Sequence, residues 1–395
     1  MEEAPRTDPG SAAAPAAHPS TPPDSPAPPV GGGPASGLPQ AARVLVIRLG
    51  AVGDVVRALA AVGLLRRERP DVRIGWLVEE PSRALLEANP VVDELYLFER
   101  HGWGAARGLA ERRAWIAAVA GLRRRLRAAR FDAALDLQGN LKSAVWAIAS
   151  GTPRRVGFGR DLAREGSWLL GGERVRLPAE ARSRLQQFAA LVRALGISAV
   201  LPPDGRPVPL PDLALRREAA ARWVAERGFD RKPWALLCPG SSRRQQFKRW
   251  PAARYAELGR RLAARGIGVA IGWGPGEEAL ADQVESGCLG GASLTPAGDL
   301  LGMAALISHA GVFVGNDSGP MHLAWAVGTP VIGIFGPTDP QLNAPPGGTC
   351  TALYEGPPRR PGERRPRQPV YLDLVRPEEV ETAVIGALDR AGVRR

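Results

Sequence analysis

Apolar and polar positions alternate along the chain in a repeated order of short apolar runs and longer amphipathic stretches. The apolar run at 43–48 precedes a stretch at 54–69 in which apolar residues recur every three or four positions. A buried strand followed by an amphipathic helix explains this change of period. Because further apolar runs alternate with helical stretches, this half predicts a doubly wound α/β domain, with strands at 73–78, 94–98 and 133–137.

The same alternation returns after a segment that suits no helix or strand interior. The stretch 201–211 contains five prolines. Proline lacks the backbone donor and restricts the residue before it, so this stretch predicts a connector between two domains. Beyond it we expect helices at 213–228 and 252–265 and strands at 234–238 and 268–271.

The stretch 311–340 predicts the most specific local structure. An apolar run reaches a polar turn, a helix opens at Ser318 and ends near Gly328, and a second apolar run follows at 331–335. A helix that starts at a turn of small residues presents free backbone N–H groups and the positive end of its dipole. We therefore expect a phosphate to bind at the start of this helix.

These patterns predict two Rossmann-like halves with ligands at the carboxyl ends of the strands, in the cleft between the halves. The first 41 residues are rich in Pro, Ala, Gly and Ser, and we expect a disordered tail there. The predicted segments are the tail 1–41, a first domain 42–205, a linker 206–212, a second domain 213–376 and a C-terminal helix 377–395.

The net charge of +12 raises the question of a nucleic-acid partner. The arginines are spread through helices rather than gathered with aromatic residues, so no nucleic acid is expected. Solvated faces explain them, with contact to anionic lipid headgroups or phosphorylated saccharides as the alternative. No apolar segment is long enough to span a membrane, so we expect a cytoplasmic protein with, at most, peripheral contact to a membrane. The cysteines suggest neither disulfides nor a metal site: Cys238, Cys288 and Cys350.

Two loops of the first half carry candidate chemistry. Asp54 follows Gly53 at the start of the first helix, where its carboxylate caps the helix or acts as a base facing the cleft. After the strand at 133–137, Gln138, Asn140 and Lys142 supply donors that could bind hydroxyls or an anionic sugar. A capped helix with an exposed lysine explains the second loop equally well.

Two loops of the second half suit a phosphate or diphosphate group. Ser241 and Ser242 precede Lys248, and hydroxyls with an ammonium could neutralise a departing diphosphate without a metal. The stretch Gly274 to Glu277 follows the next strand. At the opening of the helix near 318, His322 is either structural or touches a ligand, beside three further candidates: Asp317, Ser318 and Gly319.

Together these segments carry a family resemblance. R-V-L-V-I-R-L-G-A-V-G-D-V, D-L-Q-G-N-L-K-S, R-V-G-F, P-G-S-S with K-R-W-P, and N-D-S-G-P-M-H-L-A with G-T-P-V-I-G-I-F-G-P-T-D-P occur in this order. The chain resembles glycosyltransferase family 9, the heptosyltransferase family, over roughly residues 42–390. The resemblance implies a GT-B fold and an inverting, metal-independent transfer of heptose from ADP-heptose to the lipopolysaccharide inner core, without a cofactor. It also implies that the reaction takes place on the cytoplasmic side of the inner membrane, with possible peripheral contact to that membrane.

The resemblance also implies roles for the candidate residues. Asp54 matches the catalytic aspartate that takes the proton from the acceptor hydroxyl, and Lys248 matches the lysine that steadies the diphosphate. The first domain would bind a lipid-linked saccharide acceptor, the second the nucleotide sugar, and the C-terminal helix would cross back to the first domain. The implied donor-side residues are Ser241, Ser242, Gly274, Glu277, Asp317, Ser318, Gly319 and His322, and the acceptor-side residues are Gly53, Gln138, Asn140 and Lys142.

The chain departs from the family pattern on the acceptor side. Many members carry an H-x-x-[DE]-R element where this chain has Ser183 to Gln187. Two other functions are compatible with the residues: a GT-B nucleotide-sugar epimerase or hydrolase, which turns over without an acceptor, and a non-catalytic basic binding module, which does not respond to nucleotide sugars.

Overall fold

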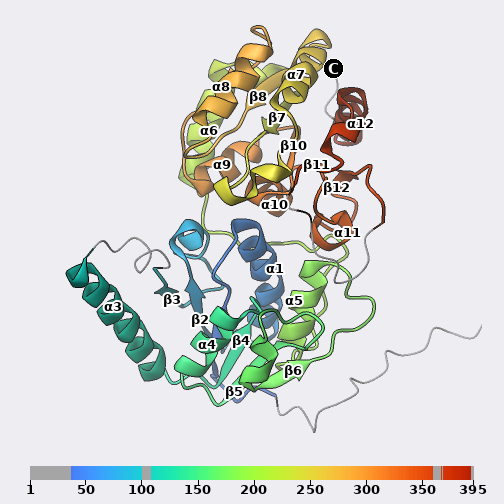
Figure 1. Cartoon of the computed structure of the whole chain (residues 1–395). Helices are drawn as coiled ribbons and strands as arrows, with labels where there is room; N and C mark the ends of the chain where they lie inside the picture. The colour runs from blue at the N-terminus through green and yellow to red at the C-terminus, as the bar shows by residue number, and fades with distance from the viewer. Residues whose placement is uncertain (1–36, 100–107, 359–365, 367, 393–395) are drawn as a thin grey trace, which may run out of the picture. The chain divides into compact units, whose positions relative to one another are not determined.

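The computed structural model describes residues 37–99, 108–358, 366 and 368–392, which fold around two parallel six-stranded sheets (Figure 1). The predicted doubly wound α/β architecture is thereby confirmed. The first sheet has the strand order β3-β2-β1-β4-β5-β6. Its strands are β1 (Arg43–Ile47), β2 (Arg73–Val78), β3 (Glu94–Leu97), β4 (Ala133–Asp136), β5 (Arg154–Phe158) and β6 (Glu173–Val175).

Both faces of the first sheet are covered by helices, which is why consecutive residues inside its central strands are apolar. In β1, Val44 and Val46 pack toward α1 (Val52–Glu68) and α5 (Arg184–Arg193). The alternate residues Leu45 and Ile47 pack on the other face with α3 (Leu109–Ala128) and α4 (Leu141–Ala149).

The second sheet has the order β12-β11-β10-β7-β8-β9 and is also parallel. Its strands are β7 (Trp234–Cys238), β8 (Gly268–Ile271), β9 (Ser293–Leu294), β10 (Val312–Asn316), β11 (Val331–Ile334) and β12 (Cys350–Leu353). Its helices are α6 (Ala214–Glu226), α7 (Ala252–Ala264), α8 (Glu278–Gly287), α9 (Leu300–Ile307), α10 (Gly319–Val327), α11 (Pro340–Asn343) and α12 (Pro377–Arg390). Short 3-10 helices are η1 (Glu80–Leu85), η2 (Ser167–Leu170), η3 (Phe229–Arg231), η4 (Arg243–Lys248) and η5 (Leu372–Leu374).

The helices α1 and α10 join the two sheets. They pack against each other, and one buried apolar cluster contains Leu59 of α1, Phe188 of α5 and Leu323 of α10. The first turns of α1 and α10 follow the carboxyl ends of β1 and β10, so the ends of two central strands, one from each sheet, face the same region.

The C-terminal helix lies on the second sheet. Its main contacts are with α7, β10 and β11. Val380, Val384 and Leu388 form its buried stripe and belong to the apolar cluster on that face of the sheet. This packing differs from the prediction that the segment 377–395 crosses to the first domain. The apolar stripe of the helix is buried against the second sheet instead.

The boundary of the predicted tail also differs. Residues 1–36 lie outside the described residues, but 37–41 are held in place. Arg69 donates from Nη1 to the carbonyl of Leu38 at 3.1 Å and from Nη2 to that of Pro39 at 2.7 Å. The Leu38 side chain is buried. The anchored chain therefore begins before residue 41.

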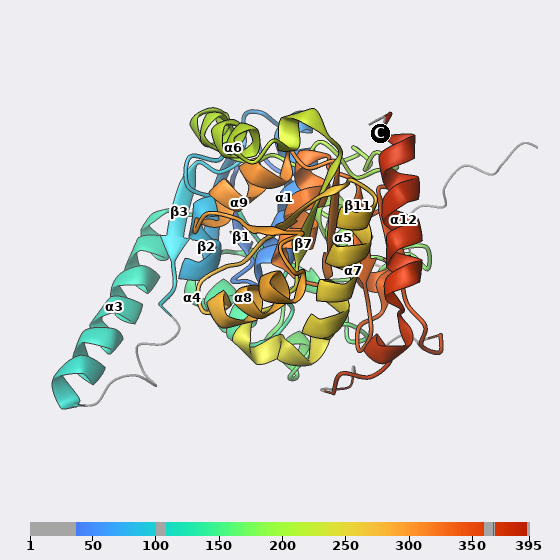
Figure 2. The ribbon, with the colours of Figure 1, turned by 90° about the horizontal axis from the view of Figure 1, so that it is seen from above.

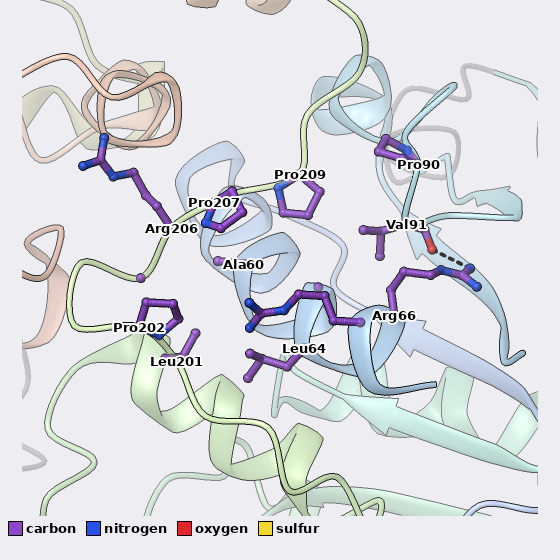
Figure 3. Close-up of a pocket in the computed structure, with 13 residues that line it drawn as sticks. Ala60, Leu64, Arg66, Pro90, Val91, Leu201, Pro202, Arg206, Pro207 and Pro209 are labelled. Atoms are coloured by element: carbon purple, nitrogen blue, oxygen red, sulfur yellow. Dashed lines mark hydrogen bonds between the residues drawn. The ribbon is translucent and has the colours of Figure 1, made fainter. Parts of the chain in front are cut away.

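The proline-rich segment has neither helix nor strand and packs along the C-terminal half of α1 (Figure 3). Gly63 allows this approach, because a Cβ there would lie 3.1 Å from Cγ of Pro209. A cavity of about 220 Å³ lies beside this contact, lined by residues that include Ala60, Leu64 and Pro207. Asp54 is in the first turn of the same helix, so this cavity is separate from the predicted site.

Candidate active site

The carboxylate of Asp54 is held between two guanidinium groups. Arg48, the residue after β1, donates to its Oδ2, and Arg57, one turn further along α1, donates to its Oδ1 at 2.5 Å. Arg48 is itself fixed by a hydrogen bond from Nη1 to the carbonyl of Leu137 at 2.9 Å. The carboxylate therefore has a defined orientation in the first turn of α1.

Its charge state follows from the same neighbours. Burial alone would raise the pKa of Asp54, but the positive charges of Arg48 and Arg57, with a smaller contribution from Arg184, hold that pKa well below its usual range. Burial in turn lowers the pKa of Arg184 to about 10. Asp54 is consequently ionised at neutral pH, as expected of a carboxylate at a helix start.

The first turns of α1 and α10 approach each other closely at glycines. A Cβ on Gly53 would lie 2.3 Å from Cδ2 of His322, and a Cβ on Gly319 would lie 2.9 Å from Cγ1 of Val52. The predicted residues Gly53, Gly319 and His322 therefore meet. Because two helix N-termini converge there, the region favours a negatively charged ligand.

Replacing Gly53 by alanine should separate these helix ends. We expect Gly53→Ala to lower the free energy of unfolding by about 1–3 kcal/mol, the usual cost of overpacking, and to weaken nucleotide binding. Calorimetric unfolding and nucleotide titration measure both effects. Gly386→Ala in α12 is the matched control, since its Cβ would meet only Nη1 of Arg390, at 3.4 Å. Equal melting temperatures for the two variants would contradict the close approach.

Lys248 and Asp317 form a buried ion pair. The Lys248 ammonium donates to Oδ2 of Asp317 at 2.9 Å and to its carbonyl at 3.2 Å. Burial raises the pKa of Asp317, but Lys248 and then His322 outweigh it and keep that pKa far below its usual range. The predicted ammonium thus lies beside the start of α10, paired with a carboxylate.

Several buried polar atoms near the start of α10 have no hydrogen-bond partner among the described residues. They are both ring nitrogens of His322, Oγ of Ser318 and Oγ1 of Thr338. Nε2 of His322 lies 3.8 Å from Oδ1 of Asp317. Buried polar groups are normally satisfied, so unpaired donors and acceptors at a helix N-terminus are typical of a ligand-binding position.

The burial of His322 has a consequence for stability. Burial, and then the nearby Arg57, lower the pKa of His322 to about 4, against the pull of Asp317 and Asp54. An unfolded histidine titrates near 6.5. The unfolded chain therefore binds more protons between pH 6.5 and 4, and the contribution of His322 to stability is complete above this window and is lost as the pH falls through it.

We expect His322→Gln to flatten this pH dependence. The free energy of unfolding of the wild type should decrease by up to ~1.4 kcal/mol per pH unit more steeply than that of the variant between pH 6.5 and 4. Denaturant titrations at a series of pH values measure both slopes. His309→Gln, at a partly exposed position outside the site, is the control and should keep the wild-type slope. Parallel curves for wild type and His322→Gln would refute the assignment.

A second group of predicted residues gathers at the ends of β7 and β8. The carboxylate of Glu277 accepts from the backbone N–H of Gly274 at 3.1 Å and lies 3.5 Å from Nη2 of Arg249. Arg249 also donates from Nε to Oγ of Ser241 at 3.2 Å. Burial raises the pKa of Glu277. Ser242 is exposed at the start of η4.

Asn316 connects this group to β10, a role that the sequence analysis did not predict. Its Nδ2 donates to the carbonyl of Pro239 at 2.9 Å, and its Oδ1 accepts from the backbone N–H of Trp250 at 2.8 Å. The only signal in the sequence is an asparagine at the end of an apolar run.

The predicted acceptor residues near the start of α4 differ in what they contact. Oε1 of Gln138 accepts from the backbone N–H of Leu49 at 3.2 Å, which places Gln138 beside the loop that leads to Asp54. Asn140 instead caps α4 by accepting from the backbone N–H of Ser143 at 3.1 Å. Lys142 pairs with Oε1 of Glu79 at 2.5 Å. Of these three, Gln138 bonds directly to the loop that leads to Asp54.

Arg57 is the most important residue missed from the sequence. Besides Asp54, it donates from Nη1 to the carbonyl of Asn343 at 3.2 Å, in α11 beside the second sheet. It thus joins the carboxylate of the first half to the second half. Its spacing of three from Asp54 on one helix could have indicated the ion pair, but its contact with Asn343 depends on tertiary packing.

The comparison with known proteins follows from this arrangement. Two parallel doubly wound sheets, with the candidate loops at their carboxyl ends, are the architecture of the GT-B fold. Residues 119–361 match glycosyltransferase family 9 (heptosyltransferase), and the chain belongs to this family. The match begins inside α3, so Asp54 lies before it.

Relatives and solved structures agree with this assignment. The chain is 27% identical over 307 residues to the lipopolysaccharide core heptosyltransferase OpsX of Haemophilus influenzae, covering 76% of this chain and 80% of that protein. It is 28% identical over 306 residues to lipopolysaccharide heptosyltransferase 1 of Escherichia coli K12, covering 76% and 89%. The structure of E. coli heptosyltransferase WaaC with ADP shares the fold, with a TM-score of 0.67, 24% identity and coverage of 87% and 99%.

Two further findings concern the described residues. None of their helices combines the length and apolar character needed to cross a bilayer. They also contain no group of three or more His, Cys, Asp or Glu side chains placed to hold a metal ion.

Proposed function

We propose that this glycosyltransferase moves a heptose from ADP-heptose to a saccharide of the lipopolysaccharide inner core, with inversion at the anomeric carbon. The observation that carries the proposal is the close approach of the first turn of α1, which holds Asp54, to the first turn of α10 in a chain of family 9. The names of the relatives support the donor and acceptor classes. We further propose that the reaction takes place in the cytoplasm.

In the proposed mechanism, Asp54 is the general base. The acceptor O–H gives its proton to the carboxylate while its oxygen bonds to the anomeric carbon. The bond from that carbon to the phosphate oxygen breaks on the opposite side, and ADP leaves with the electron pair. Because Arg48 and Arg57 hold the pKa of Asp54 low, its contribution is the position of an ionised carboxylate rather than a strong affinity for protons.

The departing diphosphate needs hydrogen-bond donors and positive charge, and the second half offers three groups that could supply them. The backbone N–H groups at the start of α10 and the ring of His322 face this region. The ammonium of Lys248 lies next to them on Asp317. We propose that these groups bind the diphosphate and stabilise the charge that develops on it. The proposed role of Lys248 requires no metal.

Titration calorimetry with nucleotide sugars tests the donor assignment. We expect ADP-heptose to bind at least tenfold more tightly than the UDP and GDP sugars, and hydrolysis without an acceptor to be far slower than transfer. Transfer is measured with inner-core saccharide extracted from bacteria that lack heptose. Preferential binding of another nucleotide sugar, or full turnover without an acceptor, would overturn the proposal.

A further inference from the structure

The helices α3 and α4 cover the same face of the first sheet, and each exposes an apolar stripe on its outer side. In α4, Leu141, Val145 and Ile148 are between 42% and 51% exposed. Their spacing of four and then three places them on one side of the helix. The opposite side, with Trp146 and Ala147, is buried on the sheet.

The outer side of α3 also exposes large apolar side chains. Leu109 and Ile116 are 73% and 52% exposed, whereas Leu122 and Leu126 are buried against the sheet. Figures 1 and 2 both show α3 standing out from the sheet that its C-terminal part covers. An unpartnered helix face with large apolar side chains is typical of an interaction surface.

A third element extends the surface beside α4. The short helix η2 contacts α4, and its Leu169 is 68% exposed. Next to it, the guanidinium of Arg160 lies 5.0 Å from the ring centroid of Trp168. We call the outer side of α3, α4 and η2 the α3/α4 surface. Its exposed apolar residues are Leu109, Ile116, Leu141, Val145, Ile148 and Leu169.

The charge of the α3/α4 surface indicates the partner. The sequence of α3 contains six arginines and one glutamate. Arg113 and Arg124 are exposed and fall on the same side of the helix as Leu109 and Ile116. Apolar side chains interspersed with arginines are typical of surfaces that lie in the headgroup layer of an anionic membrane, where each basic residue adds to the attraction.

We propose that the α3/α4 surface binds the anionic headgroup layer of a lipid bilayer. A second copy of this chain is the less favourable occupant, because pairing this surface with itself would oppose two groups of arginines. The same helix α4 carries Asn140 and Lys142, predicted acceptor residues, at its N-terminus. Docking would therefore hold the first sheet's carboxyl edge near a lipid-linked acceptor, an advantage that rests on the proposed function.

Vesicle binding by the full chain tests the proposal. The probes are vesicles of phosphatidylglycerol with phosphatidylethanolamine and vesicles of phosphatidylcholine alone, measured by sedimentation at increasing salt. We expect the wild type to bind the anionic vesicles at least tenfold more tightly, with affinity that falls as salt rises. The variants V145S/I148S/L169S and R113Q/R124Q should each lose at least tenfold.

The matched control is L215S/R222Q, which changes the same residue types at exposed positions of α6. It should bind as the wild type does, and all variants should keep the wild-type melting temperature. Wild-type affinity in the α3/α4 variants would overturn the proposal. So would a wild-type dimer, seen by light scattering, that these variants dissociate. Because no donor is present, failure here with intact transfer to a delipidated acceptor would leave the proposed function standing.

Discussion

Asp54→Asn is expected to lower kcat at least a hundredfold while leaving the affinity for ADP within threefold of the wild type. The amide is nearly isosteric, and its oxygen can still accept a hydrogen bond from Arg48 or Arg57. It cannot take up the acceptor proton, and a positioned base contributes about 10²–10⁴ to the rate. Steady-state transfer rates and ADP titration measure the two quantities.

The control must separate loss of a base from loss of an ion pair. Asp71 pairs with Nη2 of Arg69 at 2.8 Å beyond the other end of α1, so Asp71→Asn makes the same chemical change away from the site. We expect Asp71→Asn to keep wild-type kcat. If Asp54→Asn retains more than a tenth of the wild-type rate, Asp54 is not the base, whatever happens to its stability.

Much of the fold could be predicted because its strands are buried on both faces. The central strands β1, β7 and β10 are uninterrupted apolar runs followed by turns and helices, and the sequence identifies them almost to the residue. Of the strands at or near the sheet edges, β3 was predicted, but β6 and β9 were missed. β6 has the sequence E-R-V and β9 has only two residues, so neither gives a period to detect.

The sequence predicts which residues form the candidate site, but it does not predict which side chains they contact. The turn-and-helix patterns located Asp54, Gly319 and His322, and the structure brings all three together. What the sequence could not supply is the set of partners. Arg48 reaches Asp54 from the loop just after β1, and Arg57 binds both Asp54 and Asn343. These contacts join segments up to 286 residues apart, and no local pattern encodes such a distance.

Lys248 illustrates the difference most clearly. The sequence analysis predicts a cation that steadies a diphosphate, and that role stays a prediction. The structure adds that its ammonium is buried on Asp317. A buried ammonium without a partner would be costly, so one residue is expected to serve both stability and ligand binding. Substituting Lys248 alone cannot separate these two roles.

The double variant K248M/D317N separates them. Each single substitution leaves one buried charge unpaired, so K248M and D317N should each lower the free energy of unfolding by about 3–5 kcal/mol. The double variant removes both charges and should lose clearly less than the sum of the two. Denaturant unfolding measures the three values. Lys232→Met, at an exposed lysine, is the matched control and should change stability by less than ~0.5 kcal/mol.

Turnover should not follow stability in this series. If the ammonium acts on the leaving diphosphate, K248M and K248M/D317N should both have kcat at least a hundredfold below the wild type, with a smaller effect on ADP affinity. The double variant would then be folded but inactive, because it lacks the ammonium that stabilises the leaving diphosphate. If restored stability instead restores kcat to near the wild-type value, Lys248 serves only to neutralise Asp317, and the start of α10 must stabilise the diphosphate without it.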